Sequence, residues 1–206
     1  MRPRTVGLIT LGAATALAYR HVFLPWARRW GATSTETTCR LPGDELIEQP
    51  KWSMTMAVTI AALPVEVWPW LAQIGYQRGG LYSYDWLDRL FGFLDGPSAI
   101  RILPEFQDLK VGDVIPLGAG PGWPVAGVET NRSLVLAPAT GDFLVSWAFV
   151  LTPMLANSTR LVTRVRASYE RTPITTAIRL LLDPTSFIMT RKMLLGIKSR
   201  AERTAA

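Results

Sequence analysis

The chain has 206 residues, of which 49% are hydrophobic and 18% charged, with a formal net charge of +6. This apolar fraction is too high for a disordered chain, and the length fits one domain with an appended segment. The single cysteine, Cys39, excludes an intrachain disulfide and cysteine-rich zinc clusters. The single histidine, His21, lies in an apolar N-terminal stretch, which excludes histidine-based triads, histidine-rich metal sites and metalloprotease motifs.

The positive charge is concentrated at the two ends of the chain. Residues 1–30 contain five arginines and no acidic residue, and residues 186–206 contain five basic residues and one acid. Residues 31–185 contain 12 basic and 15 acidic residues. A nucleic-acid-binding protein is expected to carry a basic face on its folded body. We therefore exclude nucleic acid as a partner and favour a position near a membrane.

Residues 1–30 are predicted to be a membrane anchor or a signal segment. The stretch from Val6 to Tyr19 carries no charge, which is short for a membrane span of about 20 residues but fits a signal-peptide core. Cleavage near Ala18 would give a secreted protein. We prefer an apolar helix over residues 5–26 that anchors the protein in the cell membrane. A helix buried in the core is the third alternative.

The rest of the chain has the pattern of an α+β domain. Residues 31–50 are rich in Thr, Ser, Pro and Glu and show little periodicity, so they are interpreted as a linker to a domain over residues 51–203. Apolar and polar residues alternate over residues 51–61, which predicts a strand with one buried face. Pro64 is suited to the first turn of a helix, which ends near Gly75.

A second helix is predicted over residues 82–93, with Trp86, Leu87 and Leu90 facing inward. The chain from Pro173 to about Arg203 is predicted to be helical and divided at Pro184. Between these helices, short apolar runs separated by turn residues predict an antiparallel meander. These runs are residues 111–117, 123–129, 132–137, 143–152 and 159–169.

This order of elements resembles the SRPBCC, or START-like, superfamily, and specifically a bacterial subgroup of unassigned function. The resemblance covers residues 30–202. It implies a helix-grip fold, in which a curved antiparallel sheet surrounds a long C-terminal helix and encloses an apolar cavity. The stretches that carry the resemblance are Trp30–Thr33, Val67-Trp68-Pro69-Trp70-Leu71, Arg78–Leu87, Arg101–Asp113, Ser146–Phe149 and Phe187–Lys198.

Such a fold does not determine one function, because the superfamily includes lipid carriers, hormone receptors and polyketide cyclases. We expect binding, with or without transport, of a hydrophobic small molecule or lipid in a cavity near the bacterial cell membrane. The alternatives are a cyclase- or dehydratase-like enzyme acting on a polyketide-like substrate, and an envelope scaffold without a ligand. No metal, nucleotide or other cofactor is expected.

The candidate catalytic residues lie just before and at the start of the second predicted helix. In an apolar cavity, Asp85 is a candidate acid or base, and Tyr82 or Tyr84 would orient a carbonyl group of the substrate. The structural alternative is that Ser83 and Asp85 cap the helix while the tyrosines pack with their polar tips outward.

Several other residues are candidate ligand-binding residues, each with a structural alternative. Glu105 is either an acid–base group or part of a surface salt-bridge set. Arg164 and Arg166 would bind a carboxylate or phosphate head group on a concave face, and would be solvated on a convex face. The remaining candidates pack either against a ligand or within the core, and they are Arg78, Trp86, Trp147, Met189 and Met193.

Overall fold

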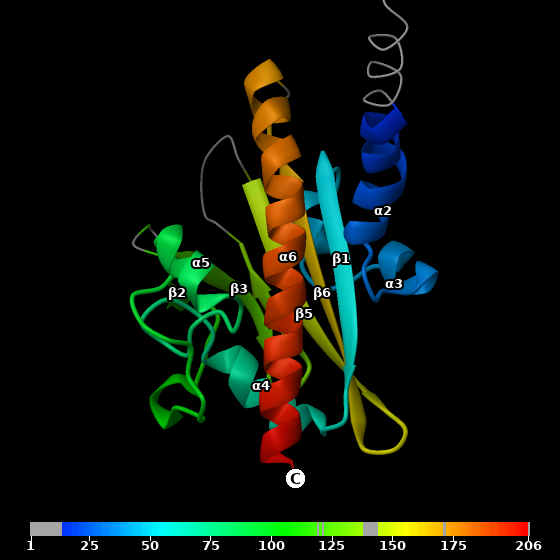
Figure 1. Cartoon of the computed structure of the whole chain (residues 1–206). Helices are drawn as coiled ribbons and strands as arrows, with labels where there is room; N and C mark the ends of the chain where they lie inside the picture. Colours follow the sequence, from blue (N-terminus) through cyan, green and yellow to red (C-terminus); the bar gives the residue numbers. More distant parts are fainter. Residues whose placement is uncertain (1–13, 119, 121, 138–143, 171, 206) are drawn as a thin grey trace, which may run out of the picture.

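The protein is an α+β domain in which a six-stranded antiparallel sheet curves around one long helix (Figure 1). The computed structural model describes residues 14–118, 120, 122–137, 144–170 and 172–205, without the side chains of residues 173–174 and 176–182. The strand order is β1-β6-β5-β4-β3-β2. The strands are β1 (Trp52–Ile60), β2 (Val114–Ile115), β3 (Trp123–Glu129), β4 (Ser133–Leu136), β5 (Leu144–Met154) and β6 (Ser158–Ser168).

The sheet is covered on both faces, which explains why its central strands are apolar on both sides. Along β5, Phe149 and Leu151 face the core, while Ser146 and Ala148 are also buried although they alternate with the core residues. The segment over residues 31–50, expected to be a linker, packs on this outer face. It contains the helix α3 (Ser34–Thr38) and a 3-10 turn (Asp44–Ile47).

The long helix α6 (Pro173–Thr204) lies along the concave face of the sheet and contacts β1 and the helices α2 and α4 (Figure 1). The predicted division at Pro184 is wrong, because α6 continues through this residue. A proline inside a helix removes one backbone hydrogen bond. Buried residues on both sides, from Asp183 to Ala201, hold α6 against the rest of the domain.

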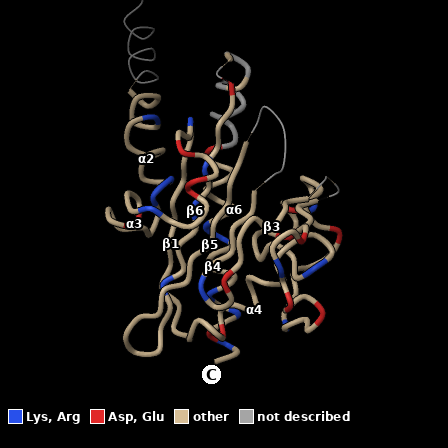
Figure 2. Tube along the Cα trace, turned by 180° about the vertical axis from the view of Figure 1, so that it is seen from behind, with Lys and Arg blue, Asp and Glu red and all other residues tan. Residues whose placement is uncertain are grey.

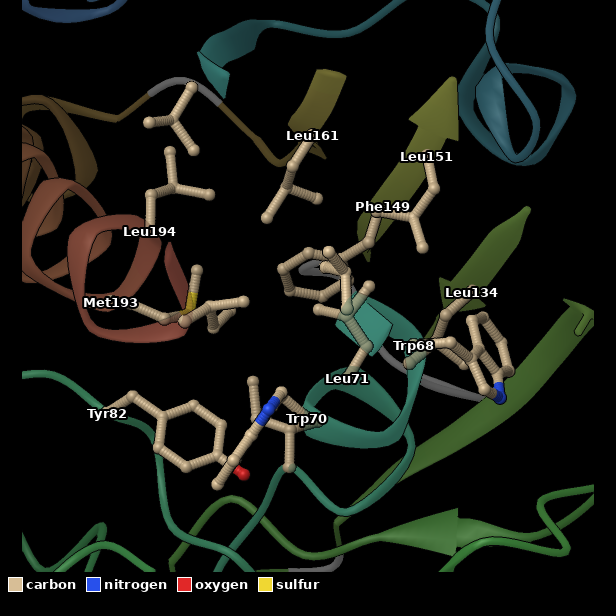
Figure 3. Packing of buried hydrophobic residues seen from close by; sticks show 14 of the residues in the cluster. Trp68, Trp70, Leu71, Tyr82, Leu134, Phe149, Leu151, Leu161, Met193 and Leu194 are labelled. Atoms are coloured by element: carbon tan, nitrogen blue, oxygen red, sulfur yellow. The ribbon is translucent and has the colours of Figure 1, made fainter. Parts of the chain in front are cut away.

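The helices α4 (Pro64–Ala72) and α5 (Asp85–Leu90) close the fold beside α6. The second predicted helix is therefore shorter than residues 82–93. Figure 3 shows the core between α4, α6 and the sheet, where Leu71, Phe149 and Leu194 are fully buried.

The described N-terminal residues form a short helix that packs on α6. A π-helical turn (Tyr19–Phe23) leads into α2 (Leu24–Ala27), whose two end residues are buried. The Phe23 and Phe187 ring centroids are 6.0 Å apart. Residues 1–13 of the predicted anchor lie outside the described residues. In the part of the chain that the structure describes, no helix is both long and apolar enough to cross a membrane.

Candidate ligand-binding cavity

A cavity of about 530 Å³ lies between the concave face of the sheet, α6 and the segment around α5. Its walls are mainly aromatic and aliphatic, because the strands turn one face toward α6 and alternate residues fill that face. The aromatic lining residues are Trp52, Phe93, Trp123, Trp147 and Tyr169, and the aliphatic ones are Met54, Leu81, Leu117, Val145, Val165, Ala167, Met189 and Met193. The polar lining residues are Ser83, Asp88, Thr175, Asp183, Ser186 and Thr190.

Three of the sequence candidates, Trp147, Met189 and Met193, line this cavity. The Trp147 ring is held in place by a hydrogen bond from its Nε1 to Thr163 Oγ1 at 2.8 Å and by an edge contact with the Trp123 ring. The two methionines come from successive turns of α6 and provide an adaptable wall. Their role in ligand binding stays a prediction.

Asp88 is the cavity residue with the most unusual environment. It is 0% exposed, and neither of its carboxylate oxygens has a hydrogen-bond partner among the described residues. Burial, followed by the nearby Asp85 carboxylate, raises the pKa of Asp88 to about 6. Ser83 Oγ, also buried in the cavity wall, likewise has no partner within the described part of the chain.

A second acid in the cavity wall, Asp183, is paired. Its carboxylate forms a salt bridge with Arg28 and accepts a hydrogen bond from Trp52 Nε1 at 2.6 Å. This contact joins the N-terminal helix, β1 and α6 at one point. Asp183 therefore stabilises the wall, whereas no described residue provides a hydrogen bond or an opposite charge to the Asp88 carboxylate.

The three candidate catalytic residues do not line the cavity together. Asp85 accepts hydrogen bonds from the backbone N–H and the hydroxyl of Ser98, at 3.1 and 2.7 Å. Tyr82 packs in the core edge-on to Trp70, and burial raises its pKa (Figure 3). Tyr84 lies beneath the Lys192 amine, 5.4 Å from its ring centroid.

The structural alternative for this segment is not confirmed either. Among the described residues α5 has no side-chain N-cap, because Ser83 Oγ makes no hydrogen bond and Asp85 binds Ser98 instead. The Tyr82 side chain, including its hydroxyl, is buried.

Three further candidates also lie away from the cavity. Arg78 donates to the backbone carbonyls of Ile74 and Ala72, and burial lowers its pKa. Glu105 is exposed. Trp86 is 63% exposed, so its predicted inward orientation, like that of Leu90, is wrong.

Figure 2 shows the sheet from behind, on the side opposite the view of Figure 1, with α3 beside β1. On this outer face, residues 31–50 cover Arg164 and Arg166 and accept hydrogen bonds from them. Arg164 forms a salt bridge with Asp44 at 2.6 Å, and Arg166 contacts the other oxygen of the same carboxylate at 2.9 Å. Arg160, on the same face, binds both carboxylate oxygens of Glu36. These arginines attach the segment to the sheet. Arg164 and Arg166 thus lie on the face opposite α6, where we expected solvated side chains, and they are instead paired with Asp44.

Sequence reasoning missed Asp88 and Asp183, the two acids of the cavity wall. The sequence offers one indication of Asp88 as a site residue, because it is an acid one helical turn after the candidate Asp85. The apolar periodicity of this segment instead placed Trp86 and Leu90 on the inner face. The pairing of Asp183 with Arg28 joins residues that are 155 positions apart, and no local pattern predicts such a pair.

Comparison with known proteins supports the fold and leaves the function open. No family model and no curated protein matches the chain. A hypothetical protein from Helicobacter pylori, jhp0584, is similar over 82% of this chain and 99% of its own, with 15% identity and a TM-score of 0.51. The chain has a helix-grip fold, in which the curved sheet surrounds one long helix. In this helix-grip domain, α6 is that long helix, and the cavity lies beside it.

Two other solved structures are similar to this domain at comparable sequence identity. Protein MLL2253 from Mesorhizobium loti has 18% identity and a TM-score of 0.45, over 75% of this chain and all of its own. The Aha1 dimer from Colwellia psychrerythraea has 16% identity and a TM-score of 0.42, over 74% of this chain and 97% of its own.

Proposed function

We propose that this protein binds one hydrophobic small molecule or lipid chain in the cavity beside α6. The observation that supports the proposal is the cavity itself. Its volume of about 530 Å³ lies within the range of about 300–1,000 Å³ that is typical of small-molecule sites. An apolar ligand there would remove the half-buried Trp123, Trp147 and Met189 side chains from water, at about 25 cal/mol per Å² of apolar surface.

The cyclase- or dehydratase-like alternative receives no support from its proposed residues. Asp85 is bound to Ser98, while Tyr82 and Tyr84 pack against other side chains. A general acid or base must come within hydrogen-bond reach of the reacting group. Binding is therefore the function that the geometry favours, and an envelope scaffold without a ligand is the competing outcome of the test.

The test is a binding titration of the full chain with N-phenyl-1-naphthylamine, a neutral fluorescent apolar probe. Met189→Trp places a large ring in the cavity wall and is expected to reduce the affinity for the probe by at least tenfold. Ile188→Trp is the matched control, because Ile188 is the preceding residue of α6 and is 46% exposed. Far-UV circular dichroism and a thermal melt would show that both variants fold.

Two results would overturn the proposal. One is a protein that does not bind the probe and yields no co-purified ligand in native mass spectrometry, which would favour the scaffold. The other is an equal affinity for the probe in Met189→Trp and Ile188→Trp, which would place the probe elsewhere.

We also propose that the N-terminal helix brings the domain to a membrane surface. Leu17, Val22 and Trp26 are more than half exposed, and Arg20 lies in the same helix. Exposed apolar side chains with tryptophan and arginine are typical of segments at the lipid interface. The full chain is expected to float with phosphatidylcholine–phosphatidylglycerol vesicles in a density gradient. The variant Val22→Asp is expected to float less. Equal flotation of the two proteins would overturn this placement.

A further inference from the structure

The strongest unexplained feature of the cavity is the unpaired carboxylate of Asp88. About 90% or more of buried polar groups in proteins have a hydrogen-bond partner, and a buried unpaired charge costs several kcal/mol. Neither carboxylate oxygen of Asp88 has such a partner in the described part of the chain. A buried acid without a partner destabilises the protein, so a positively charged group of a ligand placed beside Asp88 would be bound favourably.

The orientation of α5 shows that the burial of Asp88 is not a consequence of apolar packing by this helix. A helix positioned by its apolar residues alone would bury Trp86 and Leu90. These residues are instead 63% and 72% exposed, and Asp88 is buried. The two hydrogen bonds from Ser98 to Asp85 fix the start of the helix in this rotation. The helix thus turns its acid toward the cavity and its apolar residues outward.

A second polar group in the same wall also lacks a hydrogen-bond partner among the described residues. This group is the hydroxyl of Ser83, which lies two residues before α5 and lines the cavity. Asp183 provides the internal contrast, because Arg28 and Trp52 satisfy its carboxylate. Within the described part of the chain, the cavity therefore has a paired acid on α6 and, at its polar end near α5, two polar groups without hydrogen-bond partners.

We propose that Asp88 and Ser83 form the recognition site for the amino group of an apolar amine, whose hydrocarbon part occupies the cavity. This inference rests on the proposed binding function. An ammonium group offers three donors and a positive charge to acceptors that lack both. A fatty-acid carboxylate would bring a second negative charge next to Asp88. An alcohol would supply one donor and leave the carboxylate charge uncompensated.

The test compares three probes with the same ten-carbon chain: decylamine, decanol and decanoate. Each displaces N-phenyl-1-naphthylamine from the full chain at pH 7.5. Decylamine is expected to bind at least tenfold more tightly than decanol, and decanoate more weakly than both. Asp88→Asn is expected to weaken decylamine by about 10- to 100-fold, the range for a hydrogen bond to a charged group, and to change decanol by less than threefold. Asp95→Asn, an exposed acid in the segment after α5, is the matched control.

The outcomes separate this inference from the proposed function. If decanol displaces the fluorescent probe but decylamine binds no better, amine recognition is overturned and apolar binding stands. Persistence of the amine preference in Asp88→Asn would also overturn the inference. If none of the three probes, nor the fluorescent probe itself, binds to the wild-type protein, the proposed function fails. A thermal melt shows whether Asp88→Asn is folded, and Ser83→Ala gives an independent variant with a smaller expected loss of decylamine affinity.

Discussion

Asp85 and Asp88 lie one helical turn apart on α5, and their carboxylates have opposite environments. Asp85 accepts two hydrogen bonds from Ser98, whereas Asp88 is 0% exposed and has no hydrogen-bond partner in the described part of the chain. The nearby Asp85 carboxylate adds to the effect of burial in raising the pKa of Asp88, because a like charge disfavours ionisation. Asp85 therefore holds the helix in place, and Asp88 is the acid of the proposed amine site.

The raised pKa of Asp88 predicts that it destabilises the protein above pH 6. The folded protein holds this proton up to about pH 6, whereas the ordinary pKa in the unfolded chain is 3.8. The free energy of unfolding contributed by this group is therefore highest below pH 4 and decreases as the pH rises to 6. The decrease is about 2–3 kcal/mol. In Asp88→Asn it is absent, so the variant gains stability relative to wild type over this interval.

Urea denaturation at half-unit steps from pH 4 to pH 7.5 measures this difference. The stability of Asp88→Asn minus that of wild type is expected to increase between pH 4 and pH 6 and to stay constant above. Asp95→Asn, whose carboxyl is exposed, is expected to give a flat difference. Parallel stability curves for Asp88→Asn and wild type would contradict the burial of an ionisable carboxyl.

A structural role of Asp85 predicts a loss of stability in Asp85→Ala without a loss of apolar binding. The backbone N–H and the hydroxyl of Ser98 would lose a charged acceptor, which costs about 1.5–3 kcal/mol. Chemical denaturation measures the loss, and titration with N-phenyl-1-naphthylamine is expected to give an affinity within threefold of wild type. If Asp85→Ala were as stable as wild type but did not bind the probe, Asp85 would be a ligand-binding residue and not a structural one.

The strands and the long helix could be predicted from sequence because each follows a local pattern. Residues 123–129 form β3 as predicted, since alternation and turn residues define both of its ends. The rotation of α5 has no such local signal. Its six residues are oriented by a contact from Asp85 to Ser98, thirteen positions away, and this contact outweighs the apolar face formed by Trp86 and Leu90.

The same limit applies to the arginines of β6. The alternation of β6 correctly placed Arg164 and Arg166 on one face, but it did not say which face was concave. Their acidic partner, Asp44, lies in a segment without periodicity that resembled a linker. This pairing depends on tertiary structure. Arg164 and Arg166, which were candidate ligand contacts, attach residues 31–50 to the sheet.

The attachment of this segment predicts acid sensitivity at Glu36. Its carboxylate binds Arg160 through both oxygens, and this interaction, with bonds to Thr33, lowers the pKa of Glu36 to about 2. The resulting stability is fully present above the ordinary pKa of 4.5 and is lost as the pH falls toward 2. Glu36→Gln is therefore expected to be about 1–2 kcal/mol less stable than wild type at pH 6, with a difference that disappears near pH 2.

Guanidinium denaturation between pH 2 and pH 6 would follow this difference. The exposed Glu105 supplies the control, and Glu105→Gln is expected to lie within 0.5 kcal/mol of wild type, roughly the range of surface substitutions. A pH-independent difference between Glu36→Gln and wild type would show that the ion pair with Arg160 does not stabilise the attached segment.

The contact between α6 and the chain before α5 predicts that Gly196→Ala is destabilising. In most helix interiors this substitution stabilises by about 0.5–1 kcal/mol, because alanine loses less conformational entropy. At Gly196, however, the new Cβ would lie 2.2 Å from the backbone carbonyl oxygen of Tyr82. Tyr82 has a left-handed φ of 56° and a fully buried side chain, so its backbone has little freedom to move away. We expect a net loss of about 1–3 kcal/mol, as in other overpacked cores.

Urea denaturation would measure this loss beside Gly96→Ala, since a Cβ at Gly96 meets no atom within 4 Å. The same displacement would also move Ser83, the residue after Tyr82, in the cavity wall. Gly196→Ala is therefore expected to reduce the preference for decylamine over decanol, whereas Gly96→Ala keeps it. A Gly196→Ala protein that is more stable than wild type would mean that α6 and this segment are farther apart than the structure places them, and the polar end of the cavity would then need a different geometry.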